Sequence, residues 1–185
     1  MREMFKFVIF SFIKGGETSM DILSMKKKDY FEKNTILMIV YGTAANLGGL
    51  AQFFQDRPVS LALSLIIPAL FALIFYFTQT KVSKLQPAFP YFAVLCGFLN
   101  IVGCITSFEV TLSTIVLSFF VLVLASIHNN YGVLIAGYVV TLIALTLNVI
   151  LDTSSYTSEP VNLFVTGSLM ALAIFLQVRQ NKKMT

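Results

Sequence analysis

The sequence predicts an all-α fold, a polytopic bundle of six transmembrane helices with both termini in the cytoplasm. Of its 185 residues, 57% are hydrophobic and only 12% are charged, whereas soluble domains carry about 25% charged residues. Charged residues are also absent from five long stretches. Because about 20 apolar residues cross a bilayer core as a helix, four stretches fit one helix each and the longest fits two. The five stretches are 34–55, 58–80, 85–108, 110–151 and 160–178.

The first two predicted helices, 35–54 and 59–78, are separated only by residues 55–58, which have the sequence Gln-Asp-Arg-Pro. A connection this short forces neighbouring helices to lie antiparallel and side by side. A longer polar connection, 79–87, then leads to the third helix. We therefore expect the first pair of helices to pack as a hairpin.

The third and fourth predicted helices, 88–107 and 110–127, share the short connection 107–110 and form a second hairpin by the same argument. The longest charge-free stretch divides after residue 127, because His128, two asparagines and Tyr131 precede a glycine and make a polar turn signal. The remaining two helices follow.

The fifth and sixth predicted helices are 132–151 and 161–178, joined by the polar connection 152–160. The connections 55–58 and 128–131 have equal length, as do 79–87 and 152–160. This match suggests a repeat of three helices in inverted orientation, a device that transporters use. Residues 73 positions apart show no clear identity, which argues against a repeat.

The distribution of basic residues predicts the orientation. Lys and Arg number seven before the first predicted helix, one in the first connection, two in the second, none in the next three and three after the last helix. A cytoplasmic N-terminus places twelve of them inside and one, Arg57, outside, as the positive-inside rule requires. The predicted external connections carry four acidic residues, which are Asp56, Glu109, Asp152 and Glu159.

The sequence thus divides into a cytoplasmic N-terminal segment, 1–34, a membrane domain, 35–178, and a short cytoplasmic tail, 179–185. The apolar run at 5–13 is too short to span a bilayer. Lys14-Gly-Gly-Glu17 shortly before Met20 is what translation of a purine-rich ribosome-binding site would produce. On this interpretation residues 1–19 are not native protein, and Met20 or Met25 is the start.

The predicted spans contain no ionisable side chain, which argues against several functions. Pumps, proton-coupled transporters and voltage sensors carry charges at membrane depth. The single histidine, His128, lies in a predicted cytoplasmic turn, and Cys96 and Cys104 have no clustered partners with which to bind a metal. We therefore expect no enzyme activity, no cofactor, no metal and no nucleic-acid partner.

Uncharged polar residues within the spans are the candidate functional residues. Asn46, Asn100 and Asn148 either join helices by hydrogen bonds or line a small polar cavity. Pro68 removes a backbone hydrogen bond in the second helix and is a candidate hinge. In the external connections, Glu109, Asp152 and Glu159 are the candidates for facing a ligand outside the cell.

Small residues spaced four apart indicate faces where helices approach closely, within the chain or between copies in a homo-oligomer. These residues are Ala44, Ala45, Gly48 and Gly49 in the first helix, Gly132 and Ala136 in the fifth, and Gly167 and Ala171 in the sixth.

Two polar motifs carry a resemblance to a known family. The run Met25-Lys-Lys-Lys-Asp-Tyr-Phe-Glu-Lys-Asn34 and the turn Ser126-Ile-His-Asn-Asn-Tyr131 resemble the amino-terminal membrane region of certain Gram-positive bacterial methyl-accepting chemotaxis proteins. The resemblance implies a multi-helix sensing region in place of an external sensing domain. The sequence from Arg179 to Thr185 stops where the signalling helix of that family begins, so the resemblance implies a sensor module without its signalling domain.

We therefore expect a multi-pass protein of the bacterial cell membrane, with the lipid bilayer as its partner, that senses a small ligand or a membrane property. The alternative is a small transporter or channel that passes a neutral solute along Asn46, Asn100 and Asn148. A lipid-modifying enzyme is the weakest hypothesis, because acid–base or metal chemistry lacks residues near the membrane interface.

Overall fold

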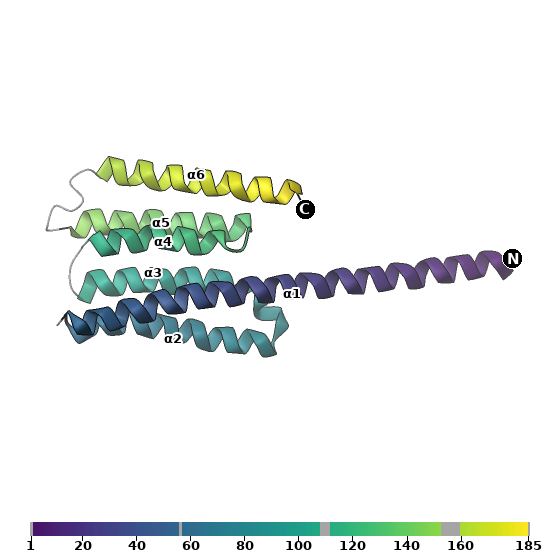
Figure 1. Cartoon of the computed structure of the whole chain (residues 1–185). Helices are drawn as coiled ribbons and strands as arrows, with labels where there is room; N and C mark the ends of the chain where they lie inside the picture. The colour runs from purple at the N-terminus through teal and green to yellow at the C-terminus, as the bar shows by residue number, and fades with distance from the viewer. Residues whose placement is uncertain (1, 56, 108–111, 153–159, 185) are drawn as a thin grey trace.

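The computed structural model describes residues 2–55, 57–107, 112–152 and 160–184, and within them the side chains of residues 24–55, 57–107, 112–152 and 163–179. This part of the chain is all-helical, with six α-helices and one short 3-10 helix (Figure 1). The helices are α1 (Arg2–Phe54), α2 (Val59–Lys81), η1 (Ser83–Ala88), α3 (Phe89–Ser107), α4 (Leu112–Ser126), α5 (Tyr131–Leu151) and α6 (Pro160–Met184).

The predicted all-helical class and the division after residue 127 are confirmed. Asn129 adopts a left-handed φ of 50°, and Asn130 caps α5 by accepting a hydrogen bond at 2.9 Å from the backbone N–H of Gly132. Asparagine tolerates the left-handed region and makes a strong helix cap, which is why these two residues end one helix and start the next.

Two helix boundaries differ from the prediction by more than four residues. No helix begins at Thr35, because α1 runs without a break from Arg2 to Phe54, and α6 continues past residue 178 to Met184. Residues 2–54 contain no proline, and the hydroxyl of Thr35 donates to the carbonyl of Phe31 within the helix instead of capping a new one. Loss of hydrophobicity marks the end of a span but does not by itself end a helix.

Four helical segments are long and apolar enough to cross a membrane: Ser24–Phe54, Val59–Lys81, Ser83–Ser107 and Tyr131–Leu151. Two shorter apolar segments, Leu112–Ser126 and Leu163–Arg179, accompany them. Many large apolar side chains on these helices point away from the bundle, among them Ile74 and Phe77 of α2 and Leu169 of α6. An apolar outer surface of this extent is typical of a membrane protein.

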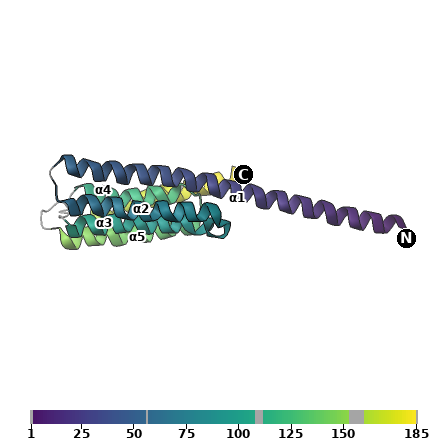
Figure 2. The same ribbon diagram turned by 90° about the horizontal axis from the view of Figure 1, so that it is seen from below.

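The helices form two neighbouring groups of three. In one group α2 packs against α1 and α3, and in the other α5 packs against α4 and α6. Helix α3 joins the groups by contacting α4 and α5, whereas the described part of α6 contacts only α4 and α5. Figure 1 shows α6 at the edge of the bundle, and Figures 1 and 2 both show the N-terminal part of α1 projecting beyond it.

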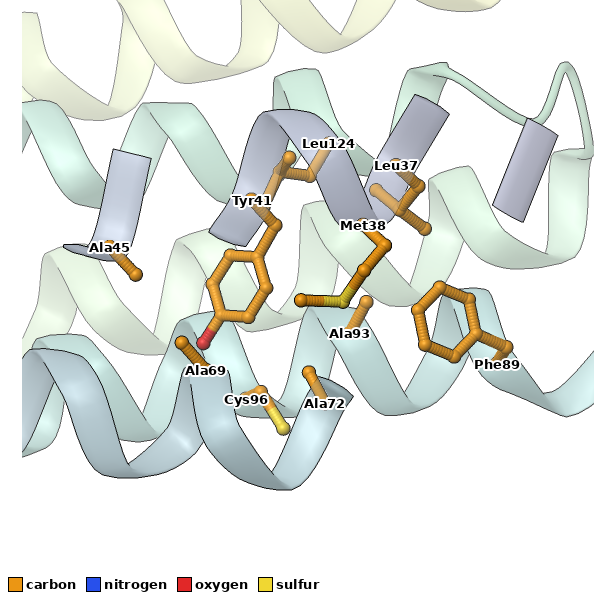
Figure 3. Packing of buried hydrophobic residues seen from close by; sticks show 10 residues of the cluster. All are labelled: Leu37, Met38, Tyr41, Ala45, Ala69, Ala72, Phe89, Ala93, Cys96 and Leu124. Carbon is orange, nitrogen blue, oxygen red and sulfur yellow. The ribbon is translucent and has the colours of Figure 1, made fainter. Parts of the chain in front are cut away.

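The largest core cluster lies where α1, α2, α3 and α4 meet. Tyr41 of α1 is 1% exposed and points toward alanines of α2 and Cys96 of α3, with Leu124 of α4 beside it (Figure 3). Alanines on α2 and α3 let these helices come close to α1 around the ring. Packing of small against large residues substitutes here for the hydrophobic effect, which does not drive helices together in lipid.

The two ends of the bundle differ in charge. The projecting part of α1, η1, the α4–α5 turn and the C-terminal end of α6 lie at one end, and the α1–α2 turn lies at the other (Figure 1). Of the eight Lys and Arg between residues 24 and 179, seven belong to the first end and only Arg57 to the second. This is the arrangement that the positive-inside rule produces, and the first end is called the basic end below.

Candidate functional site

A cavity of about 370 Å³ lies between α1, α3 and α4, with Leu65 of α2 as part of its wall. Its polar groups are few: Tyr41 and Asn100 in one part, and Gln52 and Ser113 in the other. Gln52 lies in the last turn of α1 and Ser113 in the first turn of α4, so the cavity extends toward the end opposite the basic end. An apolar cavity with few convergent polar groups is typical of small-molecule sites.

Asn100 is the candidate binding group of this cavity. Its side chain is 3% exposed, and its amide Nδ2 donates to the hydroxyl of Tyr41 at 3.0 Å. The amide oxygen, Oδ1, is buried and has no hydrogen-bond partner among the described residues. Leaving a buried acceptor unpaired costs about 1–3 kcal/mol. A hydrogen-bond donor that pairs with this oxygen therefore stabilises the site.

Small residues create the space. Ala44, Ala45 and Gly48 of α1 and Gly97 of α3 line the cavity where larger side chains would fill it. A Cβ on Gly97 would lie 3.0 Å from a methyl group of Val121, whereas a Cβ on Gly48 would lie 3.4 Å from the end of Leu65. Part of the small-residue face predicted in α1 therefore borders a cavity instead of contacting a helix directly.

Three of the other small-residue positions contact neighbouring helices within the chain. A Cβ on Gly49 would come within 2.7 Å of Ile66, and a Cβ on Gly167 would come within 3.3 Å of Phe119. Gly132 lies against the hydroxyl of Tyr91. Contact with a neighbouring helix is confirmed at these three residues, and association between copies stays a prediction.

Asn148 is a structural residue that joins α4 to α5. It is fully buried, accepts a hydrogen bond from the hydroxyl of Thr114 at 2.6 Å and donates to the hydroxyl of Ser118 at 3.2 Å. Thr141 adds a hydrogen bond at 3.0 Å to the carbonyl of Ser118. The predicted interhelical hydrogen bond of Asn148 is present, and none of these four residues lines the cavity.

Asn46 belongs neither to the cavity that Asn100 lines nor to the hydrogen-bonded group around Asn148. Its side chain is exposed and donates to the carbonyl of Gly42 in its own helix at 2.7 Å, so it joins no helices. It lines a separate groove between α1 and α2. The structure therefore does not bring Asn46, Asn100 and Asn148 together in one passage.

Pro68 is buried within α2, which is continuous from Val59 to Lys81. One turn before it, the hydroxyl of Ser64 donates to the carbonyl of Leu61 at 2.7 Å and lies 3.7 Å from the sulfur of Cys104 on α3. A hinge at Pro68 stays a prediction. Of the candidate external residues, Asp152 follows the last residue of α5, and Glu109 and Glu159 lie outside the described residues.

At the basic end lies a buried amide cluster that was not predicted from the sequence. Asn34 of α1 donates through Nδ2 to the side chain of Gln79 at 2.5 Å and to the backbone carbonyl of Gln86 at 2.9 Å. Asn34 and Gln79 are fully buried. This cluster ties α1 to both the end of α2 and η1. In the sequence, the only indication of this cluster is that Asn34 and Gln79, at the ends of two predicted spans, are uncharged amides and not charged residues.

The α4–α5 turn contacts the same part of α1. The ring of His128 lies 6.1 Å from that of Tyr30, and His128 is 5% exposed with its Nε2 unpartnered among the described residues. The pKa of His128 is lowered from 6.5 to about 4, mainly by burial and to a smaller extent by the positive charge of Lys33, while the carboxylate of Asp29 acts in the opposite direction. His128 is therefore neutral at pH 7.

The two motifs that carry the family resemblance thus meet in space. Tyr30 and Asn34 belong to the first motif, and His128 belongs to the second. No group of three His, Cys, Asp or Glu able to hold a metal ion occurs in the part of the chain that the structure describes. In comparisons with known proteins, no protein-family model, no curated protein and no solved structure matches the chain.

Proposed function

We propose that the chain is a sensor-type membrane module without enzymatic activity, with six spans in the bacterial cell membrane and both termini in the cytoplasm. One observation carries the proposal: a single continuous helix, α1, lines the cavity and also contacts both turns at the basic end. A change in the cavity therefore reaches the cytoplasmic contacts through one rigid element.

The distances suit such a connection. Tyr41 and Gly48 line the cavity, and Tyr30 and Asn34 make the contacts at the basic end. At a rise of 1.5 Å per residue, the stretch from Tyr30 to Gly48 is about 27 Å long, close to the thickness of a bilayer core. Signalling helices move by about 1–2 Å, which is enough to alter a buried hydrogen-bond cluster.

The resemblance to chemoreceptor membrane regions supports the same proposal, because its two motifs form the contact between α1 and the α4–α5 turn. In a sensor, these contacts are where a displacement of α1 becomes visible to a cytoplasmic partner. The described side chains at the basic end also include Lys81, Lys84 and Arg179, which are exposed.

The transporter alternative has less support. Its three asparagines lie in three separate places, as described above. An inverted repeat would also require α6 to contact α1 and α2 as α3 contacts α4 and α5, and the described part of α6 contacts neither. Saturable uptake of glycerol by liposomes containing the protein would favour this alternative over sensing.

The test imitates an occupied cavity by filling it. Ala44 is an exposed residue of the cavity wall, and Ala44→Leu adds a larger side chain there. Spin labels on Met25→Cys and Arg179→Cys, both at exposed positions, report the distance between α1 and α6 at the basic end. Native Cys96 and Cys104 are buried and react little.

We expect Ala44→Leu to shift this distance by about 1–2 Å in nanodiscs. Ala173→Leu is the matched control, because it makes the same substitution at an exposed position of α6 away from the cavity. The same distance distribution in the labelled parent and in Ala44→Leu would contradict the sensor proposal.

A further inference from the structure

We infer that the cavity between α1, α3 and α4 binds a small neutral molecule with an apolar body and one hydrogen-bond donor, such as a phenol or an alcohol, which donates to Oδ1 of Asn100. The inference rests on the proposed sensory function for its biological meaning. Its test measures binding alone, so a saturable site that moves no helix would count against sensing and leave the ligand assignment in place.

The need for a donor follows from Asn100. Its Nδ2 is already used on Tyr41, whereas Oδ1 is unpartnered among the described residues and has almost no accessible surface, so a ligand in the cavity reaches Oδ1 only when the Asn100 side chain rotates slightly toward it. Oδ1 can only accept a hydrogen bond. A ligand that donates one pays for its own desolvation by pairing with a group that no described residue satisfies.

The apolar, neutral body follows from the walls. Most lining residues are apolar, and none of the described residues that line the cavity is an Asp, Glu, Lys or Arg. A charged ligand would lose its hydration without gaining a counter-charge, which costs far more than one hydrogen bond returns. The cavity therefore selects against ions and against zwitterions such as amino acids.

The size excludes two other occupants. A single water molecule satisfies Oδ1 but fills only about 30 Å³ of a cavity of about 370 Å³. A lipid acyl chain fills apolar space but carries no donor at this depth, so Oδ1 stays unpaired. A molecule with one ring and one hydroxyl meets both conditions, and pockets that bind small molecules begin at about 300 Å³.

The route into the cavity follows from its second polar part. Gln52 and Ser113 lie toward the end opposite the basic end, where an amphiphile that partitions into the outer membrane interface arrives. The amide of Gln52 donates to the carbonyl of Gly48 at 3.3 Å. Asn100 then receives the hydroxyl near the centre of the bundle.

The test compares two probes that differ only in the donor: 4-(trifluoromethyl)phenol and its methyl ether, 4-(trifluoromethyl)anisole. Fluorine NMR titrations of the protein in nanodiscs report saturable binding, and empty nanodiscs give the partition into lipid. We expect the phenol to bind about tenfold more tightly than the ether, the effect of satisfying one buried acceptor.

Two variants locate the site. Asn100→Leu keeps the number of side-chain heavy atoms and removes the acceptor, and we expect it to weaken phenol binding about tenfold, to the level of the ether. The matched control is Asn46→Leu, the same substitution at an asparagine outside the cavity, which keeps the tenfold preference. Ala44→Leu occupies the cavity and weakens the binding of both probes.

Three results would overturn the inference. Equal affinity for phenol and ether would show that Oδ1 does not take the donor. A phenol preference that persists in Asn100→Leu would place the site elsewhere. Signals from protein-containing and empty nanodiscs that rise in parallel, without saturation, would show that the cavity takes no small molecule. The comparison of the probes uses the unmodified chain, so it stands even where Asn100→Leu fails to fold.

Discussion

At the scale of single residues, Asn46, Asn100 and Asn148 show that one residue type serves three purposes. Asn148 joins two helices through hydrogen bonds, Asn46 bonds only to its own helix, and Asn100 has an acceptor left over. The difference lies in the partners that other helices offer. Thr114 and Ser118 face Asn148, whereas Asn100 has Tyr41 on one side and a cavity on the other.

His128 gives a residue-scale prediction on pH. Its pKa in the folded protein, about 4, lies below the ordinary value of 6.5. Between these values the unfolded chain binds a proton that the folded chain does not, so stability is full above pH 6.5 and falls as the pH decreases to 4. The corresponding loss is up to about 3 kcal/mol, at 1.36 kcal/mol per pKa unit.

Thermal unfolding in detergent between pH 7.5 and 4 checks this prediction. His128→Gln removes the titrating ring, and we expect its stability to depend less on pH than that of the unmodified chain. The groups near the ring, Lys33 and Asp29 of α1, are present in both proteins, so the difference between the curves isolates His128. Parallel curves would show that His128 is not buried as the structure has it.

The sequence could predict these residues only in part. It identifies polar residues in apolar stretches, because a polar residue in lipid requires a partner. It does not identify the partner, since Tyr41 and Asn100 are 59 positions apart. The amide cluster of Asn34 and Gln79 was not predicted, because both residues lie at the ends of predicted spans, where an amide is ordinarily solvated.

At the scale of the elements, apolar stretches bounded by turn residues predict which segments cross the membrane. They do not predict the ends of a helix that continues beyond its apolar stretch. The Asn129-Asn130 turn was predictable because asparagine has a specific backbone preference. The lengths of α1 and α6 were not, because the polar residues beyond each span are compatible with both helix and coil.

Glycines distinguish tight from loose helix contacts and give an element-scale prediction. A Cβ on Gly103 of α3 would lie 2.6 Å from the Cβ of Ser64 on α2, so Gly103→Ala must push the two helices apart. We expect it to destabilise the fold by about 1–3 kcal/mol. A Cβ on Gly48 meets only the flexible end of Leu65 at 3.4 Å.

Gly48→Ala is therefore the matched control, and the gain in helix propensity makes it neutral or stabilising by up to about 1 kcal/mol. Unfolding of both variants by SDS in mixed micelles measures the difference. Equal losses for the two variants would show that α2 and α3 are not as closely packed at Ser64 as the structure indicates.

At the scale of the whole molecule, the number and direction of the helices follow from charge placement, and their packing does not. The charge-free stretches predict six helices because the bilayer excludes ions from its core. The hydropathy pattern does not predict that α6 lies at the edge of the bundle or that α3 contacts both groups of helices. That arrangement depends on small residues such as Gly97 and Gly137, which lie against Val121 and Ala125 of α4.

The orientation in the membrane gives the last prediction. The basic end faces the cytoplasm if the positive-inside rule holds, which places the α1–α2 turn outside and η1 inside. Gln55 and Ser83 are exposed residues of these two regions. In bacteria that express Gln55→Cys, a membrane-impermeant maleimide should label intact cells, whereas Ser83→Cys should react only after the membrane is opened.

The unmodified chain is the control, because Cys96 and Cys104 are 1% and 4% exposed and should stay unlabelled in both conditions. Labelling of Ser83→Cys in intact cells, with protection of Gln55→Cys, would invert the topology. The cavity mouth near Gln52 and Ser113 would then open toward the cytoplasm, and the contacts of Tyr30 and Asn34 would lie outside the cell. Such a result would remove the route by which α1 carries a signal inward.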